Sequence, residues 1–281
     1  MAPPLSPVGA LARAADYDRY LSALFAPAGR REALFALIAF NHEIARIPEA
    51  VSEPMLGRIR LQWWREALEA IHVGEVPRRH EVALPLADAI RAHGLDRDAF
   101  DRLLDAREAD LEPDVPPDLA ALERYAAASG GALTTLMQQA CGVTAAPALE
   151  AGRQVGTAWA LVGTLRAAPR AAARGRCMLP AALLADAGVA VEDVLAGRAF
   201  GRLAGAAGPV GRRAEGLLGA AREARRAVPR QGRGPLLIAR LADLYLARLR
   251  AAGWDPRDPR LDASLLRKQA AMLAGALFLR Y

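Results

Sequence analysis

The sequence predicts an all-α protein with a single domain. Apolar residues recur at spacings of three and four along most of the 281-residue chain, as they do on one face of a helix. Strand-type alternation is nearly absent, and no long linker divides the chain. Hydrophobic residues make up 53% of the sequence, and much of that share is alanine, a strong helix former. We therefore expect closely packed helices in one domain over residues 1–281, with residues 1–15 as a flexible N-terminal segment.

Three helices are predicted in the first quarter of the chain. In residues 16–25, Asp16 is a favourable N-cap, and the aromatic and leucine side chains fall on one helical face. Residues 32–47 carry an apolar stripe that Pro48 should end. Residues 54–71 begin with a proline, which is well tolerated in the first turn of a helix. The side chains expected to point inward from this third helix are Met55, Ile59, Trp63 and Leu68.

Eight further helices are predicted, separated by proline and glycine. One of them should end near Ala168, because the residue before a proline is pushed out of the α region. The pair Gly208-Pro209 should mark another break. The predicted ranges are 81–92, 98–111, 118–141, 148–168, 181–187, 212–227, 236–252 and 264–279.

The stretch 156–180 differs from the rest of the chain in its charge. An apolar helix runs into Arg166 and Pro169, and an arginine-rich connector follows. No acidic residue occurs between Glu150 and Asp186, so this stretch cannot itself hold a divalent cation, which needs carboxylate oxygens. It can attract an anion, or it can simply be solvated.

Charge and cysteine content limit the classes of function. A net charge of +6 and a pI near 10.0 allow nucleic acid or an anionic membrane surface as a partner. Lys268 is the only lysine, the arginines are scattered among acids, and no nucleic-acid-binding motif is present. We therefore expect no nucleic-acid partner. Cys141 and Cys177 stand in separate segments, which indicates a reducing cytoplasm and no zinc site.

The sequence does not predict an integral membrane protein. The first sixteen residues, MAPPLSPVGALARAAD, lack the charged and continuous apolar regions of a secretory signal. No apolar run approaches the roughly 18 residues that span a bilayer. We expect a cytoplasmic protein, and its positive charge leaves peripheral contact with the inner membrane open.

Three stretches together resemble the squalene/phytoene synthase family. Ala39-Phe40 lies near the place where family enzymes carry an aspartate-rich motif. Residues 156–166 and the GRCMLP run at 175–180 are similar to the family's N-I-L-R-D-x-x-x-D and G-R-x-Y-L-P. LARLRAAGWDP at 246–256 resembles the C-terminal helix and turn. The resemblance implies a helical bundle of the isoprenoid-synthase type around a central apolar cavity.

The resemblance also implies a chemistry. Family enzymes join two prenyl diphosphates head to head, and carboxylates on two facing helices hold each diphosphate through magnesium ions. The metal neutralises the charge that grows on pyrophosphate as the carbon–oxygen bond ionises. Two aspartates at i and i+4 lie on one helix face, which explains their fixed spacing.

Most of these carboxylates are missing at the matching positions. The first motif, D-D-x-x-D, falls on residues 45–49, where only Glu49 is acidic and Pro48 is expected to turn it off the helix face. The second motif falls on Ala167 and Ala171. We therefore expect no metal site, no cofactor and no catalytic residue. Magnesium would be needed only by an enzyme whose ligands had moved elsewhere.

One branch of the family is closest in pattern. LGRIRLQWWRE at 56–66 and AWAL at 158–161 resemble the complex I assembly factor 6 group and its bacterial relatives, which are thought to act in assembly of the membrane arm of NADH dehydrogenase. This implies a non-catalytic assembly or accessory factor whose partner is a membrane-complex client protein or a prenyl lipid. The first alternative is a head-to-head prenyltransferase with relocated ligands, and a basic lipid- or RNA-surface binder is the second. The relocated ligands would be Glu43, Glu49 and Glu53.

Candidate site residues follow from the cavity that the resemblance implies. A guanidinium recognises phosphate through two parallel hydrogen bonds, so arginines near the cavity are candidates for binding an anion. These candidates are Arg166, Arg170 and Arg176, and capping of the helix end is the alternative role of Arg166. The candidate polar residues lining the cavity are Asn41, Glu43, Gln62, Tyr125 and Gln138.

Overall fold

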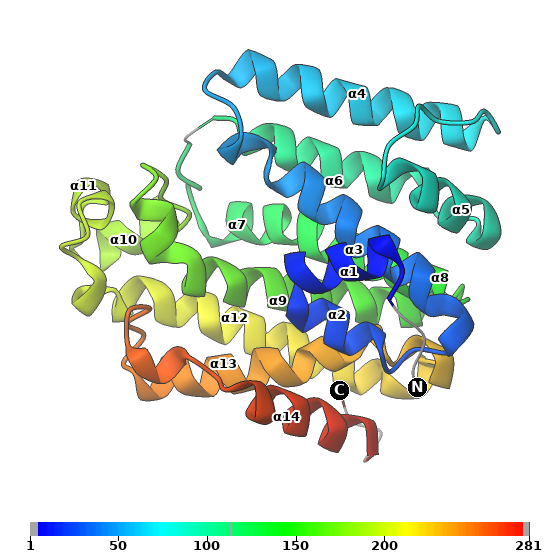
Figure 1. The fold of residues 1–281 in the computed structure, drawn as a ribbon. Coiled ribbons are helices and arrows are strands. Elements are labelled where there is room, and N and C mark those ends of the chain that lie inside the picture. Colours follow the sequence, from blue (N-terminus) through cyan, green and yellow to red (C-terminus); the bar gives the residue numbers. More distant parts are fainter. Residues whose placement is uncertain (1–4, 113, 278–280) are drawn as a thin grey trace.

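The computed structural model describes residues 5–112, 114–277 and 281, and it confirms the all-α prediction (Figure 1). Regular structure within these residues is entirely helical. None of the described helices combines the length and the apolar character that a bilayer-spanning segment needs. The α-helices are α1 (Pro7–Ala15), α2 (Tyr17–Ala23), α3 (Arg31–Ala45), α4 (Pro54–His72), α5 (Ala83–His93), α6 (Arg97–Ala109), α7 (Leu119–Ala126), α8 (Ala132–Ala140), α9 (Ala146–Ala172), α10 (Ala181–Asp186), α11 (Val191–Leu195), α12 (Ala204–Glu223), α13 (Ile238–Ala251) and α14 (Leu265–Leu277).

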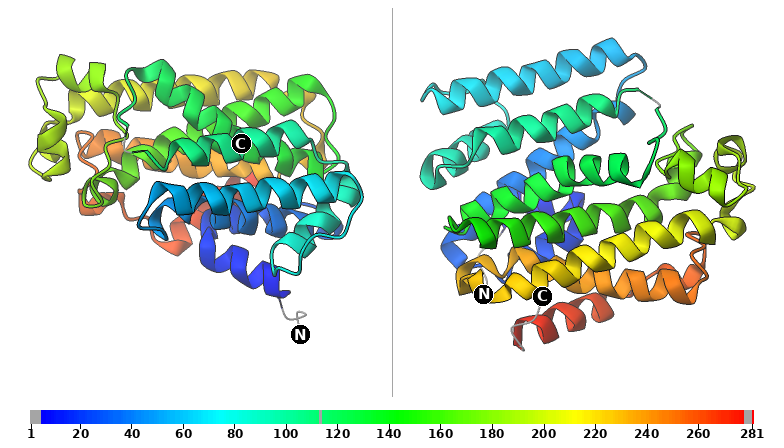
Figure 2. Two further views of the ribbon diagram at one scale, coloured as in Figure 1. Left: turned by 90° about the horizontal axis from the view of Figure 1, so that it is seen from above. Right: turned by 180° about the vertical axis from the view of Figure 1, so that it is seen from behind.

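The helices stack around α9, which contacts α7, α8, α12 and α13. In Figures 1 and 2 the helix α4 forms one edge of the stack, next to α5 and α6, and α14 forms the opposite edge, against α13. Two apolar clusters fill the interior, one centred on α3 to α6 and α8 and the other on α9, α12 and α13. The end of the predicted helix 264–279 lies partly outside the described residues.

Residues 7–15 form the helix α1, where a flexible segment was expected. The hydroxyl of Ser6 caps this helix and accepts a 3.0 Å hydrogen bond from the backbone N–H of Gly9. Val8 and Ala12 are buried in the same apolar cluster as α3. The helix α3 covers this short apolar face, a contact that the local sequence does not reveal.

The predicted breaks at two prolines are wrong. The helix α9 continues through Pro169 to Ala172, and α12 starts at Ala204 and passes through Pro209. A proline inside a helix removes one hydrogen bond and costs about 3 kcal/mol. The long packed interface between α9 and α12 buries alanines, leucines and valines of both helices and outweighs that cost.

The segment predicted as one helix over 118–141 contains a π-helical turn at Ala127–Gly131, between α7 and α8. This turn crosses α9 at Gly130 and Gly156. A Cβ atom added to Gly156 would lie only 2.1 Å from the carbonyl oxygen of Gly130. The two backbones can touch because neither residue has a side chain.

The rotation of α4 differs from the prediction. Met55 and Ile59, expected inside, are 58% and 59% exposed. At Gly57 the helix approaches Leu111 so closely that an added Cβ would lie 2.3 Å from that side chain, and this contact fixes the inward face. The buried residues of α4 are Gly57, Leu61, Trp64, Ala67, Leu68 and Ile71, of which Leu68 was predicted to point inward.

Candidate functional site

A cavity of about 340 Å³ opens between α3, α7 and α9 and the chain that follows α6. A hollow of about 610 Å³ adjoins it and shares part of its lining, including Ala171 and Arg176. Asn41 and Ala45 line the cavity from α3. The helix α9 lines it with residues spaced three or four apart, which lie on one helical face. These are Trp159, Ala160, Gly163, Thr164, Ala167 and Ala171.

A buried carboxylate at the wall of this cavity binds two arginines and a tyrosine. One oxygen of Asp110 accepts hydrogen bonds from Arg107 Nη1 at 3.0 Å and from the Tyr125 hydroxyl at 2.9 Å. Its other oxygen accepts from Arg176 Nη2 at 2.8 Å. Arg107 also donates to Asn41 Oδ1 at 3.4 Å. We call these five residues the Asp110 cluster.

The helix ends bring this cluster together. Asp110 is the C-cap of α6, and Arg107 lies one turn earlier, so both face the cavity. Arg176 comes from the connector after α9, where Gly175 turns the chain with a φ of 73°. Tyr125 comes from the last turn of α7.

The electrostatics of the cluster favour its protonated groups. Burial raises the pKa of Tyr125 to about 12, and Asp110 adds to this shift while Arg107 opposes it. Burial alone would lower the pKa of Arg107, but the adjacent Tyr125 and Asp110 outweigh it and raise that pKa. By residue type, the cluster contains two arginines and one acid.

The excess positive charge suits an anion. The Nε atom of Arg107 is buried and has no hydrogen-bond partner among the described residues. The combined lining of the cavity and the adjoining hollow holds more arginines than acids. The arginines are Arg19, Arg107, Arg170, Arg174 and Arg176, and the acids are Glu49 and Asp110.

The donor set does not fit a magnesium ion. Glu49 lies in the short turn after α3 and forms an ion pair with Arg174, and Asp110 is held by Arg107 and Arg176. Across residues 5–112, 114–277 and 281, no group of three His, Cys, Asp or Glu side chains is placed to hold a metal. Magnesium needs several oxygen ligands, and both lining acids are already engaged with arginines.

The three candidate arginines have different positions. Arg176 belongs to the Asp110 cluster, and Arg170 is an exposed residue of the adjoining hollow. Arg166 lines neither space. Its guanidinium lies 3.5 Å from the ring centroid of Tyr245 on α13, a cation–π contact. The sequence placed Arg166 at a helix end, but α9 continues beyond it.

Two of the five candidate lining residues, Asn41 and Tyr125, do line the cavity. Gln62 is exposed on the outer face of α4 and donates to Glu66 at 3.3 Å. Gln138 is fully buried, and its amide presses against Gly152 of α9. Both predictions are therefore corrected, because helix rotation directs these amides elsewhere.

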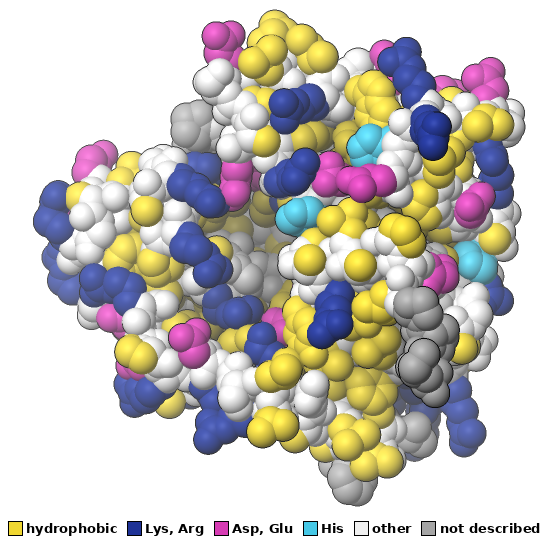
Figure 3. All heavy atoms as spheres, viewed as in Figure 1, with side chains coloured by type: hydrophobic (Ala, Val, Ile, Leu, Met, Phe, Trp, Pro, Cys, Tyr) yellow, Lys and Arg dark blue, Asp and Glu magenta, His cyan; other side chains and the backbone are white. Residues whose placement is uncertain are grey.

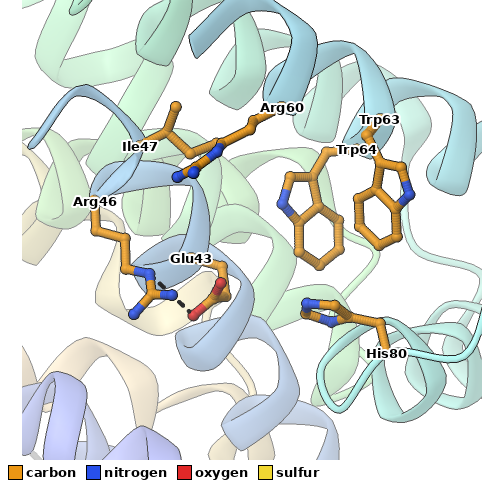
Figure 4. Close-up of a pocket in the computed structure, with 7 residues that line it drawn as sticks. All are labelled: Glu43, Arg46, Ile47, Arg60, Trp63, Trp64 and His80. Atoms are coloured by element: carbon orange, nitrogen blue, oxygen red, sulfur yellow. Dashed lines mark ion pairs between the residues drawn. The ribbon is translucent and has the colours of Figure 1, made fainter. Parts of the chain in front are cut away.

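Glu43 does not line the central cavity. It lines a separate pocket of about 350 Å³ (Figure 4). It pairs there with Arg46 at 3.4 Å. The ring centroids of Trp63 and Trp64 each lie 5.2 Å from that of His80 on the same pocket wall. The tryptophans of the LQWWRE run thus help to pack α4 onto its neighbours.

The proposed relocated ligands do not converge. Glu43 lines the pocket of Figure 4, whereas Glu49 lines the central cavity. Glu53 is exposed at the start of α4. Three carboxylates in separate places cannot share one metal ion.

Arg107 and Asp110 hold the site together, and neither was predicted from the sequence. Both lie in a helix end rich in alternating charges, and such a pattern normally indicates a solvated surface. The arginine three residues before the acid was the one available signal. Only the structure shows that side chains from α7 and from the connector after α9 contact this pair at the cavity wall.

The all-α bundle with a cavity between α3 and α9 agrees with the architecture that the resemblance to squalene/phytoene synthases implies. The family model for squalene/phytoene synthase matches residues 12–267, and the chain belongs to this family.

Two groups of relatives share parts of the sequence. The bovine (Bos taurus) protein named NADH dehydrogenase (ubiquinone) complex I, assembly factor 6 is 35% identical over 185 residues, which are 66% of this chain and 55% of the bovine protein. This chain thus spans about half the length of that relative. A presqualene diphosphate synthase from Sinorhizobium fredii is 28% identical over 92% of this chain and 93% of its own.

Solved structures show the same fold. A dehydrosqualene synthase has a TM-score of 0.83 at 17% identity, covering 97% of this chain and 95% of its own. The squalene synthase of Alicyclobacillus acidocaldarius has a TM-score of 0.79 at 22% identity, covering 89% and 94%. At these identities the likeness concerns the fold alone.

Proposed function

We propose that this chain is a non-catalytic member of the squalene/phytoene synthase family that acts as an assembly or accessory factor for respiratory complex I. The complex I half of the proposal is supported by the bovine relative and by a human protein of the same name, which is 34% identical over 66% of this chain. The alternative, a head-to-head prenyl diphosphate synthase, is favoured by the longer but weaker match to the Sinorhizobium fredii enzyme.

The chemistry of the two cavity walls supports the first part of the proposal, that the chain is non-catalytic. Ala45 on α3 and Ala167 and Ala171 on α9 line one cavity, at positions where the resemblance implies metal-binding aspartates. An alanine side chain offers no oxygen to a metal. Asp110 and Glu49 carry the remaining lining carboxylates, and magnesium could bind them only by displacing their arginine partners.

The cavity is better suited to bind a diphosphate anion than to promote ionisation of its carbon–oxygen bond. Arg107 and Arg176 supply positive charge at one wall, and the alanines of α9 supply an apolar wall beside it. A prenyl diphosphate or a related anionic lipid fits both features. Such a ligand would be bound without the magnesium ions that promote loss of pyrophosphate.

A turnover assay tests the non-catalytic half. Purified protein is incubated with magnesium and farnesyl or geranylgeranyl diphosphate, beside a heat-killed sample and an active presqualene diphosphate synthase. We expect no coupled prenyl product above the heat-killed sample. Product formed at a rate proportional to protein concentration would contradict the proposal and favour the alternative.

Gene deletion tests the complex I half. We expect the deletion strain to lose assembled NADH dehydrogenase on native gels while its carotenoid and hopanoid content stays unchanged. Restoring the gene should restore the assembled complex. A strain with intact complex and depleted isoprenoids would support the prenyl synthase instead.

A further inference from the structure

The helix α14 presents an apolar face to solvent. Leu266, Ala270, Leu273 and Leu277 are spaced four, three and four residues apart, so they lie on one side of the helix. The three leucines are 77%, 52% and 70% exposed. An outward helix face in a globular protein is normally polar. Figure 3 shows apolar side chains gathered along the edge of the molecule that α14 forms.

The leucine face cannot turn inward, because the opposite side of α14 is anchored. Met272 and Gly275 are buried against the rest of the molecule. The ammonium group of Lys268 forms a 2.8 Å ion pair with Asp18 of α2. This outward rotation is therefore a fixed property of the fold.

A basic segment lies at the C-terminal end of α14. Between positions 225 and 233 the chain carries four arginines and no acidic residue. None of the four forms an ion pair with an acid in the described part of the chain, in contrast to most arginines on α4, α6 and α12. These residues are Arg225, Arg226, Arg230 and Arg233.

A hollow joins the basic segment to α14. It measures about 350 Å³. Arg230 and Arg233 line one side, and Gly275 and Leu277 of α14 line another. Leu237 adds to the apolar lining. The hollow thus places cationic groups beside an apolar wall, as an anionic headgroup with an acyl chain requires.

We propose that the leucine face of α14 and the adjacent arginines bind the surface of an anionic membrane. The leucines enter the boundary between headgroups and acyl chains, and the arginines attract the lipid phosphates. The surface is separate from the Asp110 cluster, so the inference holds whether or not the central cavity is catalytic. It would place the chain beside a membrane complex.

The charge of the segment favours lipid over a protein partner. A protein surface of ordinary composition would offer both signs of charge, whereas four arginines without an acid match a uniformly anionic surface. The helix α14, drawn in red, also lies at the edge of the stack in the right-hand view of Figure 2.

Flotation with vesicles tests this surface on the full chain. We expect the protein to float with vesicles that contain phosphatidylglycerol or cardiolipin, and to float weakly or not at all with pure phosphatidylcholine. Raising the salt concentration should release it. In the triple variant Arg225→Gln, Arg226→Gln and Arg230→Gln, each lost charge should weaken partition about fivefold. The double variant Leu266→Gln and Leu273→Gln should weaken it about tenfold or more.

Matched control variants lie on α4 and its loop, at the opposite edge. Met55→Gln with Ile59→Gln removes two apolar side chains of comparable exposure. The triple variant Arg60→Gln, Arg78→Gln and Arg79→Gln removes the same charge from exposed arginines. Both controls should float like the unmodified chain.

Three outcomes would overturn the proposal. The first is no flotation with anionic vesicles, and the second is an equal loss in the control variants. The third is binding to native membranes that protease treatment abolishes, with no binding to pure lipid, since a protein would then be the partner. Circular dichroism of each variant excludes unfolding as the cause of a loss.

Discussion

Arg176 and Asp110, 66 positions apart in the chain, meet in a 2.8 Å hydrogen bond that ties the connector after α9 to the end of α6. The same carboxylate compensates the buried guanidinium of Arg107. One acid therefore holds two arginines at the cavity wall. Its removal would leave their positive charges without an acidic partner.

We predict that Asp110→Asn destabilises the chain by about 3 to 5 kcal/mol, the usual cost of removing one partner from a buried ion pair. Urea unfolding measures this change. Glu49→Gln is the control, because it breaks an ion pair whose side chains are both about half exposed. The control should cost less than about 1 kcal/mol. Equal effects of the two variants would show that the Asp110 cluster is as solvated as the surface.

Tyr125 should make stability depend on alkaline pH. Its pKa is raised from 10.0 to about 12, so the folded state holds the phenolic proton more tightly than the unfolded state does. The resulting stabilisation is fully present below pH 10 and is lost as the pH rises through about 12. Two pKa units correspond to about 2.7 kcal/mol.

The measurement compares the unmodified chain with Tyr125→Phe in urea between pH 8 and 12. The difference in unfolding free energy should be constant up to about pH 10 and then shrink. Phenylalanine cannot ionise, so the other titrating groups cancel in the comparison. A difference that stays flat to pH 12 would place Tyr125 in a more polar environment than the structure gives it.

Arg176 and Arg166 should respond differently to an anion. We predict that Arg176→Gln weakens the binding of inorganic pyrophosphate, measured calorimetrically with EDTA present, by about tenfold or more, since a charge-assisted hydrogen bond contributes about 1.5 to 3 kcal/mol. Arg166→Gln should leave binding unchanged but lower stability by about 0.5 to 2 kcal/mol, through loss of its contact with Tyr245. Weakened binding in both variants would place Arg166 in the cavity after all.

The sequence predicted the fold well because helical periodicity is a local property that packing seldom reverses. It failed on α4, where apolar residues occupy two faces and one of the buried positions is Gly57, which carries no hydrophobic signal. It failed at Pro169 and Pro209 because the cost of a proline is local but the burial that outweighs it is not.

The sequence named part of the candidate site: Asn41, Tyr125 and Arg176 were among the candidate residues, and all three line the cavity. The α9 positions at Ala167 and Ala171 were placed correctly on the cavity wall, since their spacing fixes a common face. Arg107 and Asp110 were missed because three separate segments bury them. No pattern within 98–111 distinguishes that pair from a surface ion pair.

The crossing of Gly130 and Gly156 provides the last prediction. Gly156→Ala should destabilise the chain by about 1 to 3 kcal/mol or more, because the new Cβ would collide with the Gly130 carbonyl at 2.1 Å and force α9 away from the π-helical turn. Gly163→Ala is the matched control on the same helix, since nothing lies within 4 Å of its added Cβ. It should be neutral or stabilise by up to about 1 kcal/mol, as alanine does in place of a helical glycine.

Thermal unfolding followed by circular dichroism measures both variants. The π-helical turn follows directly on α7, so displacement of α9 should also disturb the contact between Tyr125 and Asp110. In Gly156→Ala the pH dependence of stability between about 10 and 12 should therefore diminish, whereas Gly163→Ala should retain it. A Gly156→Ala variant with unchanged stability would mean that the two backbones do not touch. The position of α9 relative to the π-helical turn would then differ from that in the structure.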